Sequence, residues 1–583
     1  MSSASTLKAA WLAWALFVVG CGVGLQWYRV DNAIDGWAPE QAPMGEARTY
    51  VVVGGPADAF SRVASELRNL PSVDRVIDPL AIALLRPLGG PTPDRLVTHD
   101  GWAGGFYFAA AGVKDEPLVD AIHDVVDREP LLRVAGPAVY QVALNTASQA
   151  RMPYIAAAIA FVGLIGVRLC GFSWIVAARA SGVVVGSQIA LLGMMSWLGL
   201  AVDATASMAP PLMAALGYSL VLHRAGGAGV GLLVGCYATT AIAAASVAVA
   251  PVGPLRQFGL VSLGGLTLIA IGSWLLVGRG ARASAMTARF GRSSQAAWLT
   301  SAVFVAAGIA MAPRLSVNGD GVALLPDASR EWAAFEELDS DLTGMLPSQL
   351  VLEPPAPGIA AELETSPAIT KVIDSSRLDG LPPGSRYWVL AHNAALPELE
   401  ATVDRARATI NASGGTLEWR GLAAQLAAAE QQVARVAVGA LPTALATTAI
   451  AAWIAARSLR AALAASVAAT VPSAALVVIL SSFDIALTPP HLLVFAIATG
   501  VAADDLLHAC RAWSTGDTGS WRRACIASSA VSVACLLPLL ASPFPPARQF
   551  AWMLAVALSV ASVSAVVLFP RLLPRLHGSR EHA

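Results

Sequence analysis

The sequence has few charged residues and almost no lysine. Charged side chains make up 13% of the 583 residues, whereas a soluble globular domain carries about 25%. Lysine occurs only at Lys8, Lys114 and Lys371, hydrophobic residues make up 56% of the chain, and its mean hydropathy is +0.61. Because there is too little charge to cover a soluble surface, most of the surface is expected to face lipid. The net charge of −1 argues against a nucleic-acid-binding protein.

The chain also lacks the motifs of metal sites, disulfide frameworks and nucleotide-driven pumps. C-x-x-C pairs and His/Cys clusters with zinc spacing are absent, so no metal site is expected. No Walker motif occurs, and the G-x-x-x-G-S pattern at 182–187 lies in an apolar span, where it cannot cradle a phosphate. We therefore expect neither an ATP-driven pump nor an enzyme, no bound cofactor and no disulfide. The six cysteines all lie in apolar segments, at Cys21, Cys170, Cys236, Cys510, Cys525 and Cys535.

Long apolar runs divide the chain into two similar parts. A helix needs about 20 apolar residues to cross roughly 30 Å of hydrocarbon. One such run lies at 9–28 and five lie between 152 and 278, followed by one at 295–312 and five between 433 and 570. The predicted fold class is a polytopic α-helical membrane protein with twelve transmembrane helices (TM1–TM12) in two pseudo-symmetric 1+5 halves and two small α+β extracytoplasmic domains.

The composition of the chain also predicts where each part begins and ends. The polar segments follow the first helix of each half, and a short polar linker separates the halves. The predicted parts are 1–28 (TM1), 29–151 (extracytoplasmic α+β domain 1), 152–280 (TM2–TM6), 281–294 (cytoplasmic linker), 295–312 (TM7), 313–432 (extracytoplasmic α+β domain 2), 433–576 (TM8–TM12) and 577–583 (cytoplasmic tail).

Three sequence matches indicate an internal duplication. "PLRQFG" at 254–259 matches "PARQFA" at 546–551, and "VAGPAVYQ" at 134–141 matches "WRGLAAQL" at 419–426. The polar segments also begin alike, with "RVDNAIDGWAPE" in the first and "SVNGDGVALLPD" in the second. Matches in the same order and at nearly constant spacing predict two structurally equivalent halves.

Each polar segment alternates strand and helix patterns, which is typical of a small α+β domain. The first segment reads as "TYVVVGG", a helix at 58–69, "VDRVID", "GGFYFAAAG", a helix at 117–127 and "LLRVAG". The second repeats that order with "SQLVLEP", a helix at 358–366, "ITKVID", "RYWVLAH", a helix at 397–412 and "TLEWRG".

The distribution of arginine predicts the orientation in the membrane. Arginines gather in alternate connections between the spans, and this side is expected to be cytoplasmic. Both termini then lie in the cytoplasm of a multi-pass protein of the bacterial inner (plasma) membrane, and both α+β domains lie outside. A signal peptide or a lipoprotein anchor, loosely matched by "VVGC" at 18–21, is the alternative for the first run. The flanking tryptophans and the uncleavable repeat partner at 295–312 favour a retained helix.

The stretch "GVAADDLLHACRAW" at 500–513 carries two adjacent aspartates inside a predicted span. A charged carboxylate at the bilayer centre costs about 2.5–3.5 kcal/mol on insertion scales. Repulsion between Asp504 and Asp505 adds to that cost when both are ionised, so the pair is expected to take up and release protons as a coupled unit. The alternative interpretation is a packing device, in which the aspartates are paired with a neighbouring group.

Further residues are candidates for the same proton relay. Gly500 and His508 share the helix face of the first aspartate, where Gly500 lets another helix approach and His508 is placed to pass a proton on. The next span carries Ser528, Ser529 and Ser532, whose hydroxyls are expected to bridge the carboxylates to water. For the histidine the alternative is an interfacial residue, and for the serines it is helix packing.

The first half lacks these acids. Alignment of His223 with His508 places Ser219 and Leu220 opposite the two aspartates. Only the second half is then expected to carry the proton site, so the two halves differ chemically.

Together these features resemble the resistance–nodulation–division (RND) superfamily, in particular its MMPL-like exporters. The resemblance rests on the duplicated one-plus-five topology, the two external segments, the Gly-x-x-x-Asp motif "GVAAD", the loop start "VDNAIDGWAP" and the closing "LFPRLLPRL". It implies proton-driven export of a lipid or other hydrophobic compound by alternating access, with Asp504 and Asp505 as the proton-carrying acids and Ser532 near the family's hydroxyl position. This chain departs from many relatives in its acid-free first half and its short external segments.

The partners expected on this basis are a hydrophobic or lipid substrate, protons and membrane lipids. A homo-oligomer or a periplasmic partner protein is compatible with the same arrangement. Two other functions are alternatives: a non-transporting lipid- or sterol-sensing or biosynthetic-complex assembly protein, and a protein-export accessory. Tolerance of Asp504→Asn would favour the first alternative, and a secretion defect on deletion would favour the second.

Overall fold

A computed structural model describes most of the chain. The described residues are 2–28, 49–78, 98–99, 101–110, 113–203, 205–250, 252–277, 295–315, 329–341, 346–376, 382–392, 396–487, 491, 493–516, 520–542 and 544–573. Four predicted segments lie outside the described residues: the two loop starts at 29–40 and 316–327, the linker at 281–294 and the tail at 577–583.

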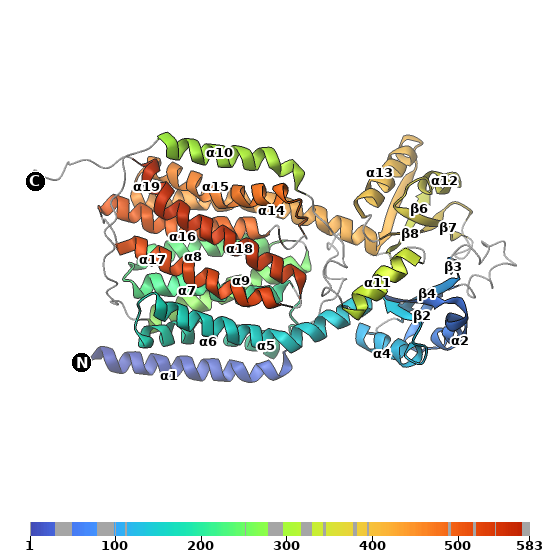
Figure 1. Ribbon diagram of the computed structural model, residues 1–583, viewed down its shortest axis with the longest axis horizontal. Helices are drawn as coiled ribbons and strands as arrows, with labels where there is room; N and C mark the ends of the chain where they lie inside the picture. The colour runs from blue at the N-terminus through green and yellow to red at the C-terminus, as the bar shows by residue number, and fades with distance from the viewer. Residues whose placement is uncertain are drawn as a thin grey trace, which may run out of the picture.

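Most of the described residues belong to a bundle of long apolar helices (Figure 1). Within the described ranges, nine helices are long and apolar enough to cross a membrane. This is the architecture of a polytopic helical membrane protein. The bundle consists of α1 (Ser2–Gly22) with the turn η1 (Val23–Trp27), α5 (Pro137–Leu169), α6 (Trp174–Trp197), α7 (Ala209–Ala225), α8 (Val230–Ala248), α9 (Gly253–Leu276), α10 (Gln295–Met311), α14 (Leu422–Ala456), α15 (Leu459–Ser482), α16 (Leu493–Thr515), α17 (Ser520–Leu536), and α18 (Pro545–Val563), which η12 (Ser564–Leu568) joins to α19 (Phe569–Leu572).

Three bundle helices, α7, α14 and α16, are not among the nine. Helix α7 has only 17 residues, and α14 contains a shorter apolar stretch at Leu441–Ala456. Helix α16 has 23 residues and contains the two aspartates and a histidine. All three nevertheless pack among the other helices of the bundle, α7 against α9 and α17, and α16 against α8, α14 and α15.

The helix contacts occur in matching pairs along the chain. Helix α1 packs on α6 as α10 packs on α15, and α6 packs on α9 as α15 packs on α18. Helix α7 packs on α17 as α16 packs on α8, so each of these two contacts joins the first part of the bundle to the second. The duplicated sequence therefore folds into a duplicated set of helix contacts, with α7, α8, α16 and α17 at their meeting point.

The matched sequence segments explain part of this repetition. Strand β5 (Arg133–Ala135) enters α5 through Gly136, and β9 (Thr416–Gly421) enters α14 at Gly421. Their φ angles are +119° and +100°, with ψ near 180°, a backbone conformation essentially restricted to glycine. The match between "VAGPAVYQ" and "WRGLAAQL" thus reflects the same kind of junction, in which a strand passes through a glycine into a long helix.

The second matched segment holds the turns at one end of the bundle. The Gln257 amide donates to the carbonyl oxygen of Ala201, and the Gln549 amide donates to the carbonyl oxygen of Ala486 over 2.9 Å. Each glutamine follows the arginine of its "RQF" segment at the start of α9 or α18. The glutamines therefore tie each turn to the last long helix of its repeat.

Asp203 lies in the first of these turns and caps the start of the following helical segment. Its backbone N–H donates to Gln257 Oε1 over 2.8 Å, and its Oδ1 accepts from the N–H of Ala206 over 2.7 Å. Burial raises the pKa of Asp203 to about 7, although the hydrogen bonds from Ala206 and Thr205 act in the opposite direction. The carboxyl group is therefore expected to titrate near neutral pH.

This shift predicts a pH-dependent stability. The folded protein keeps a proton on Asp203 between the ordinary pKa of 3.8 and about 7, where the unfolded chain has released it. The free energy of unfolding is therefore higher at low pH, and the contribution of this group is lost as the pH rises through that window. We expect Asp203→Asn, which keeps the acceptor oxygen, to flatten this fall in thermal unfolding curves recorded in detergent across pH. The exposed control Asp120→Asn should follow the wild type, and identical curves for both variants would contradict the assignment.

The two polar segments form two sheets beyond one end of the bundle, and α5 and α14 run from the bundle to these sheets (Figure 1). The first sheet has the order β2-β4-β1-β5, with β3 paired to β4, and the second has the order β7-β8-β6-β9. All pairs are antiparallel. The remaining elements are β1 (Tyr50–Pro56), α2 (Ala57–Arg68), β2 (Val73–Ile77), β3 (Thr98–His99), β4 (Trp102–Ala109), α4 (Asp115–Val126), α11 (Arg330–Asp341), β6 (Leu346–Glu353), α12 (Ile359–Leu363), β7 (Ile369–Asp374), β8 (Arg386–Ala391) and α13 (Leu396–Ala412).

The strand and helix patterns of both polar segments are confirmed, and the sheets have the same topology. One face of each sheet packs on its own two helices in a separate apolar core. The opposite faces meet, and the ring centroids of Phe108 and Trp388 lie 5.9 Å apart. The sequence did not predict the strand β3 or the helix α11. Helix α11 comes from the second polar segment but packs beside β5 of the first sheet, where Arg133 forms an ion pair with Glu337 over 2.5 Å.

Candidate functional site

Asp504 and Asp505 lie near the middle of α16, where α7, α8 and α17 converge. Both are buried, with exposed fractions of only 7% and 4%. Because successive residues of a helix point about 100° apart, the two side chains face different neighbours. Asp504 faces α8, and Asp505 faces α17 and α7.

Two threonines of α8 hold the carboxylate of Asp504. Thr239 Oγ1 donates to Oδ1 over 3.3 Å, and Thr240 Oγ1 donates to the same oxygen over 3.5 Å. The thiol of Cys236, one turn earlier, donates to the backbone carbonyl of Asp504 over 3.8 Å. The acid of the second half is therefore solvated by hydroxyl groups from a helix of the first half.

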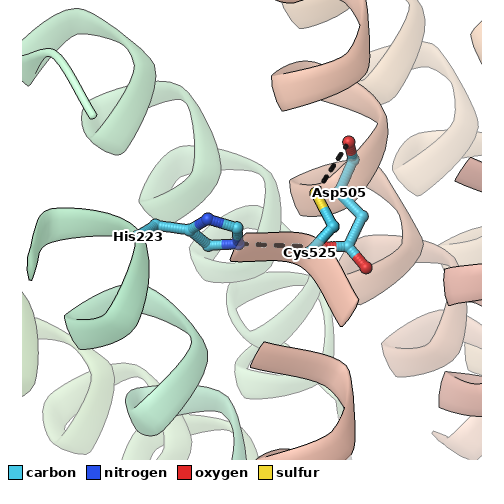
Figure 2. A group of neighbouring side chains, drawn as sticks. All are labelled: His223, Asp505 and Cys525. Atoms are coloured by element: carbon cyan, nitrogen blue, oxygen red, sulfur yellow. Dashed lines mark hydrogen bonds and ion pairs between the residues drawn. The ribbon is translucent and has the colours of Figure 1, made fainter. Parts of the chain in front are cut away.

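Two serines of α17 hold the carboxylate of Asp505 in the same manner. Ser529 Oγ donates to Oδ2 over 2.8 Å, and Ser528 Oγ donates to Oδ1 over 3.4 Å. The thiol of Cys525 donates to the backbone carbonyl of Asp505 over 3.8 Å, as Figure 2 shows. The carboxylates are thus bonded directly to hydroxyls rather than placed at a distance from them.

The two sets of donors come from a further repeat in the sequence. "CYATTA" at 236–241 matches "CIASSA" at 525–530, with a cysteine followed after two residues by a pair of hydroxyl side chains. The spacing between the two segments agrees with that of the other repeats. The match would have predicted Thr239 and Thr240 as site residues, but it is short and lies within two alanine-rich helices that differ at the remaining polar positions.

A histidine of the first half completes the cluster. His223 on α7 is buried, and its Nε2 lies 3.6 Å from Asp505 Oδ1. Its ring stacks on that of His508, with centroids 3.8 Å apart and planes inclined by 19°. His508 is therefore buried against the first half. The sequence marked His223 only as the repeat partner of His508, because one sequence does not show which helices meet.

Neither aspartate has an arginine or lysine partner among the described residues. The contacts of the two carboxylates are with hydroxyls and one imidazole. Hydroxyl donors partly replace water around a carboxylate, but they supply no compensating charge. Ionising both adjacent carboxylates is therefore unfavourable, and the cluster is suited to binding and releasing a proton.

The remaining predicted residues have distinct places around the cluster. Gly500 faces α8, and a Cβ atom there would lie 3.3 Å from the Cβ of Ala243, so the glycine permits the close approach that was predicted. Ser532 is buried next to α7 and its Oγ donates to the carbonyl oxygen of Ala215 over 2.6 Å. Its hydroxyl therefore links α17 to α7, whereas the bonds to Asp505 come from Ser528 and Ser529.

One group of three side chains has atoms of the kinds that bind metal ions. His223, Asp505 and Cys525 each offer one ligand atom, and these atoms lie within 4.8 Å of one another. In the described geometry the thiol donates to the Asp505 carbonyl, and both carboxylate oxygens accept hydroxyl hydrogen bonds. These contacts favour a hydrogen-bonded cluster at this site.

No protein-family model matches the sequence, and no curated protein matches it. The resemblance to the RND superfamily therefore stays a prediction.

Proposed function

We propose that this protein is a proton-driven exporter of a lipid or another hydrophobic compound, of the RND/MMPL type. One observation carries the proposal: two adjacent carboxylates are buried in a helix bundle, accept hydrogen bonds from hydroxyls, and have one imidazole 3.6 Å away but no arginine or lysine partner among the described residues. A purely structural ion pair would require a cation next to these acids. A carboxyl group that changes its protonation state instead needs partners that can hydrogen-bond to both the ionised and the protonated form, and hydroxyls do so because they both donate and accept.

The proposal includes twelve membrane spans in two halves. The paired helix contacts support this number, because α7 and α16 occupy matching places, each packed on a recognised span of the other half, and α14 packs on α15 as α5 packs on α6. We further propose that the protein lies in the bacterial inner membrane with both termini in the cytoplasm and both sheets outside. The alternation of arginine-rich and arginine-poor connections supports that orientation.

The proposed cycle begins with protonation of the aspartate pair from outside. Loss of negative charge removes the desolvation penalty and weakens the bonds from the hydroxyls of α8 and α17. These helices then repack where the two halves meet. Helices α5 and α14 continue from the bundle into the sheets, so they provide a rigid route by which this repacking moves the external domains. Release of the proton to the cytoplasm resets the cycle.

The energy available limits what such a cycle can move. One proton crossing a potential of 100 mV supplies about 2.3 kcal/mol. Each methylene withdrawn from an apolar environment into water costs about 0.8 kcal/mol. A single proton therefore supports a modest lipid gradient or the exposure of a few methylenes, and complete extraction of an acyl chain requires an acceptor that shields it.

Transport in reconstituted vesicles tests the proposal. Purified protein is placed in vesicles of phosphatidylethanolamine and phosphatidylglycerol that contain a fluorescent NBD-labelled phospholipid, and the leaflet position of the label is followed by dithionite quenching. An imposed pH gradient is expected to drive net movement of the label in one direction, and a protonophore should abolish it. If movement of the label is the same with and without the pH gradient, and is unchanged by the protonophore, proton coupling is contradicted.

A further inference from the structure

Two buried histidines in the cluster have polar atoms without hydrogen bonds. His223 and His508 have exposed fractions of 1% and 6%. Within the described part of the chain, both ring nitrogens of His223 and the Nε2 of His508 have no hydrogen-bond partner. Unsatisfied buried nitrogens of this kind are unfavourable, so a second function for the pair, beyond packing, would account for them.

The ring of His223 is directed at the carboxylate of Asp505. Figure 2 shows the imidazole of α7 pointing across to the aspartate, and the distance from Nε2 to Oδ1 is 3.6 Å. A movement of a few tenths of an ångström would bring this pair within ordinary hydrogen-bond distance. The titratable side chains in contact with His223 are Asp505 and His508 on α16 and Cys525 on α17. In the described residues it forms no ion pair with α5, α6, α8 or α9.

We propose that His223 is the proton-exchange partner of Asp505, and that its stacking on His508 limits the two histidines to one positive charge. The inference rests on the proposed function. It adds that the first half of the chain contributes a base to the proton site, whereas the second half contributes the acids. The proton site then belongs to both halves, and its protonation state depends on how closely α7 approaches α16.

The proposed step transfers one proton within the pair. The O–H bond of protonated Asp505 breaks, and the proton binds to Nε2 of His223, which leaves a carboxylate facing an imidazolium. The total charge of the pair does not change, so no net charge is created in the bundle. Ser528 and Ser529 donate to the carboxylate in this state.

The stacked rings make the two histidines compete for charge. With centroids 3.8 Å apart, an imidazolium at His223 repels a second one at His508. Removal of the His223 ring and removal of the His508 ring should therefore shift the protonation of Asp505 in opposite directions. Without His223 the ionised carboxylate loses its cationic partner, whereas without His508 the charge on His223 forms more readily.

Phenylalanine variants separate this chemical role from packing. His223→Phe and His508→Phe keep a flat ring for stacking and remove the nitrogens, and His223→Gln serves as a second variant if the phenylalanine disturbs folding. Protonation of Asp505 is followed as the carboxylic-acid C=O infrared band that Asp505→Asn removes. The pH profile of NBD-phospholipid movement in vesicles gives a second readout, and His123→Gln on α4 is the matched control.

The expected shifts have opposite signs. His223→Phe and His223→Gln should move the midpoint of the Asp505 band and the transport profile to higher pH by at least about one unit. His508→Phe should move both to lower pH, and the control should leave them unchanged. If both phenylalanine variants titrate like the wild type, or shift the same way, the exchange role of His223 is wrong while proton coupling stands. If Asp505→Asn removes no band and leaves transport intact, the proposed function itself is wrong.

Discussion

Asp505→Asn and Asp504→Asn are each expected to reduce gradient-driven transport to the level of protein-free vesicles. Asparagine has nearly the same shape as the protonated acid and keeps an oxygen that accepts from Ser529 or Thr239. The helices should therefore pack normally, but the site can no longer release a proton and is held in its neutral state. Export of NBD-labelled phospholipid under an imposed pH gradient measures the effect.

Folding and insertion must be checked alongside transport. Both variants should be recovered from membranes in wild-type amounts and elute from size exclusion as the wild type does, because a neutral side chain is less costly to bury than a carboxylate. Asp120→Asn, on the exposed side of α4, is the matched control and should transport normally. Wild-type flux through the double variant Asp504→Asn/Asp505→Asn would rule out these acids as the coupling site.

Removal of the hydroxyl donors should have the second-largest effect. Thr239→Val with Thr240→Val leaves Asp504 without its hydroxyl donors, and Ser528→Ala with Ser529→Ala does the same for Asp505. A hydrogen bond to a charged group contributes about 1.5–3 kcal/mol, which corresponds to roughly 10- to 100-fold in rate for each bond lost. We expect the serine pair to have the larger effect, because the 2.8 Å bond from Ser529 is the shortest of the four hydroxyl bonds to the two carboxylates.

The control for these variants removes equivalent groups elsewhere in the bundle. Thr443→Val and Ser559→Ala each delete an exposed hydroxyl that bonds only to its own helix. These changes should leave vesicle transport unchanged. Equal losses for the control and the cluster variants would indicate a general packing effect, and unchanged transport in both cluster pairs would show that the hydroxyls do not solvate the working carboxylates.

Much of the external fold could be predicted from local patterns. The strands of both polar segments and their helices were identified because short strand-like apolar runs alternate with helical segments along the chain. Helix α11 was not identified, because its contact with β5 and the ion pair between Glu337 and Arg133 depend on a segment distant in sequence.

The candidate site was predicted in part. Asp504 and Asp505 stood out because buried acids are rare in apolar helices, and Ser528 was found because it lies in the adjoining segment. Thr239 and Thr240 were missed, since their link to Asp504 depends on α8 packing against α16. The hydroxyl donors of Asp504 are therefore found in the other half of the chain, whereas those of Asp505 lie in the next helix of its own half.

The sequence by itself determined that the chain is a duplicated, lipid-facing helical protein with one pair of adjacent acids in an apolar segment, because hydropathy, repeats and charge are properties of the chain order. Only the tertiary structure decided what surrounds that pair: hydroxyls of α8 on one acid, hydroxyls of α17 on the other, and His223 stacked on His508. The physical reason is that hydrogen bonds and ring contacts act over a few ångströms in space, whereas Thr240 and Asp504, like His223 and His508, are separated by more than 250 positions along the chain.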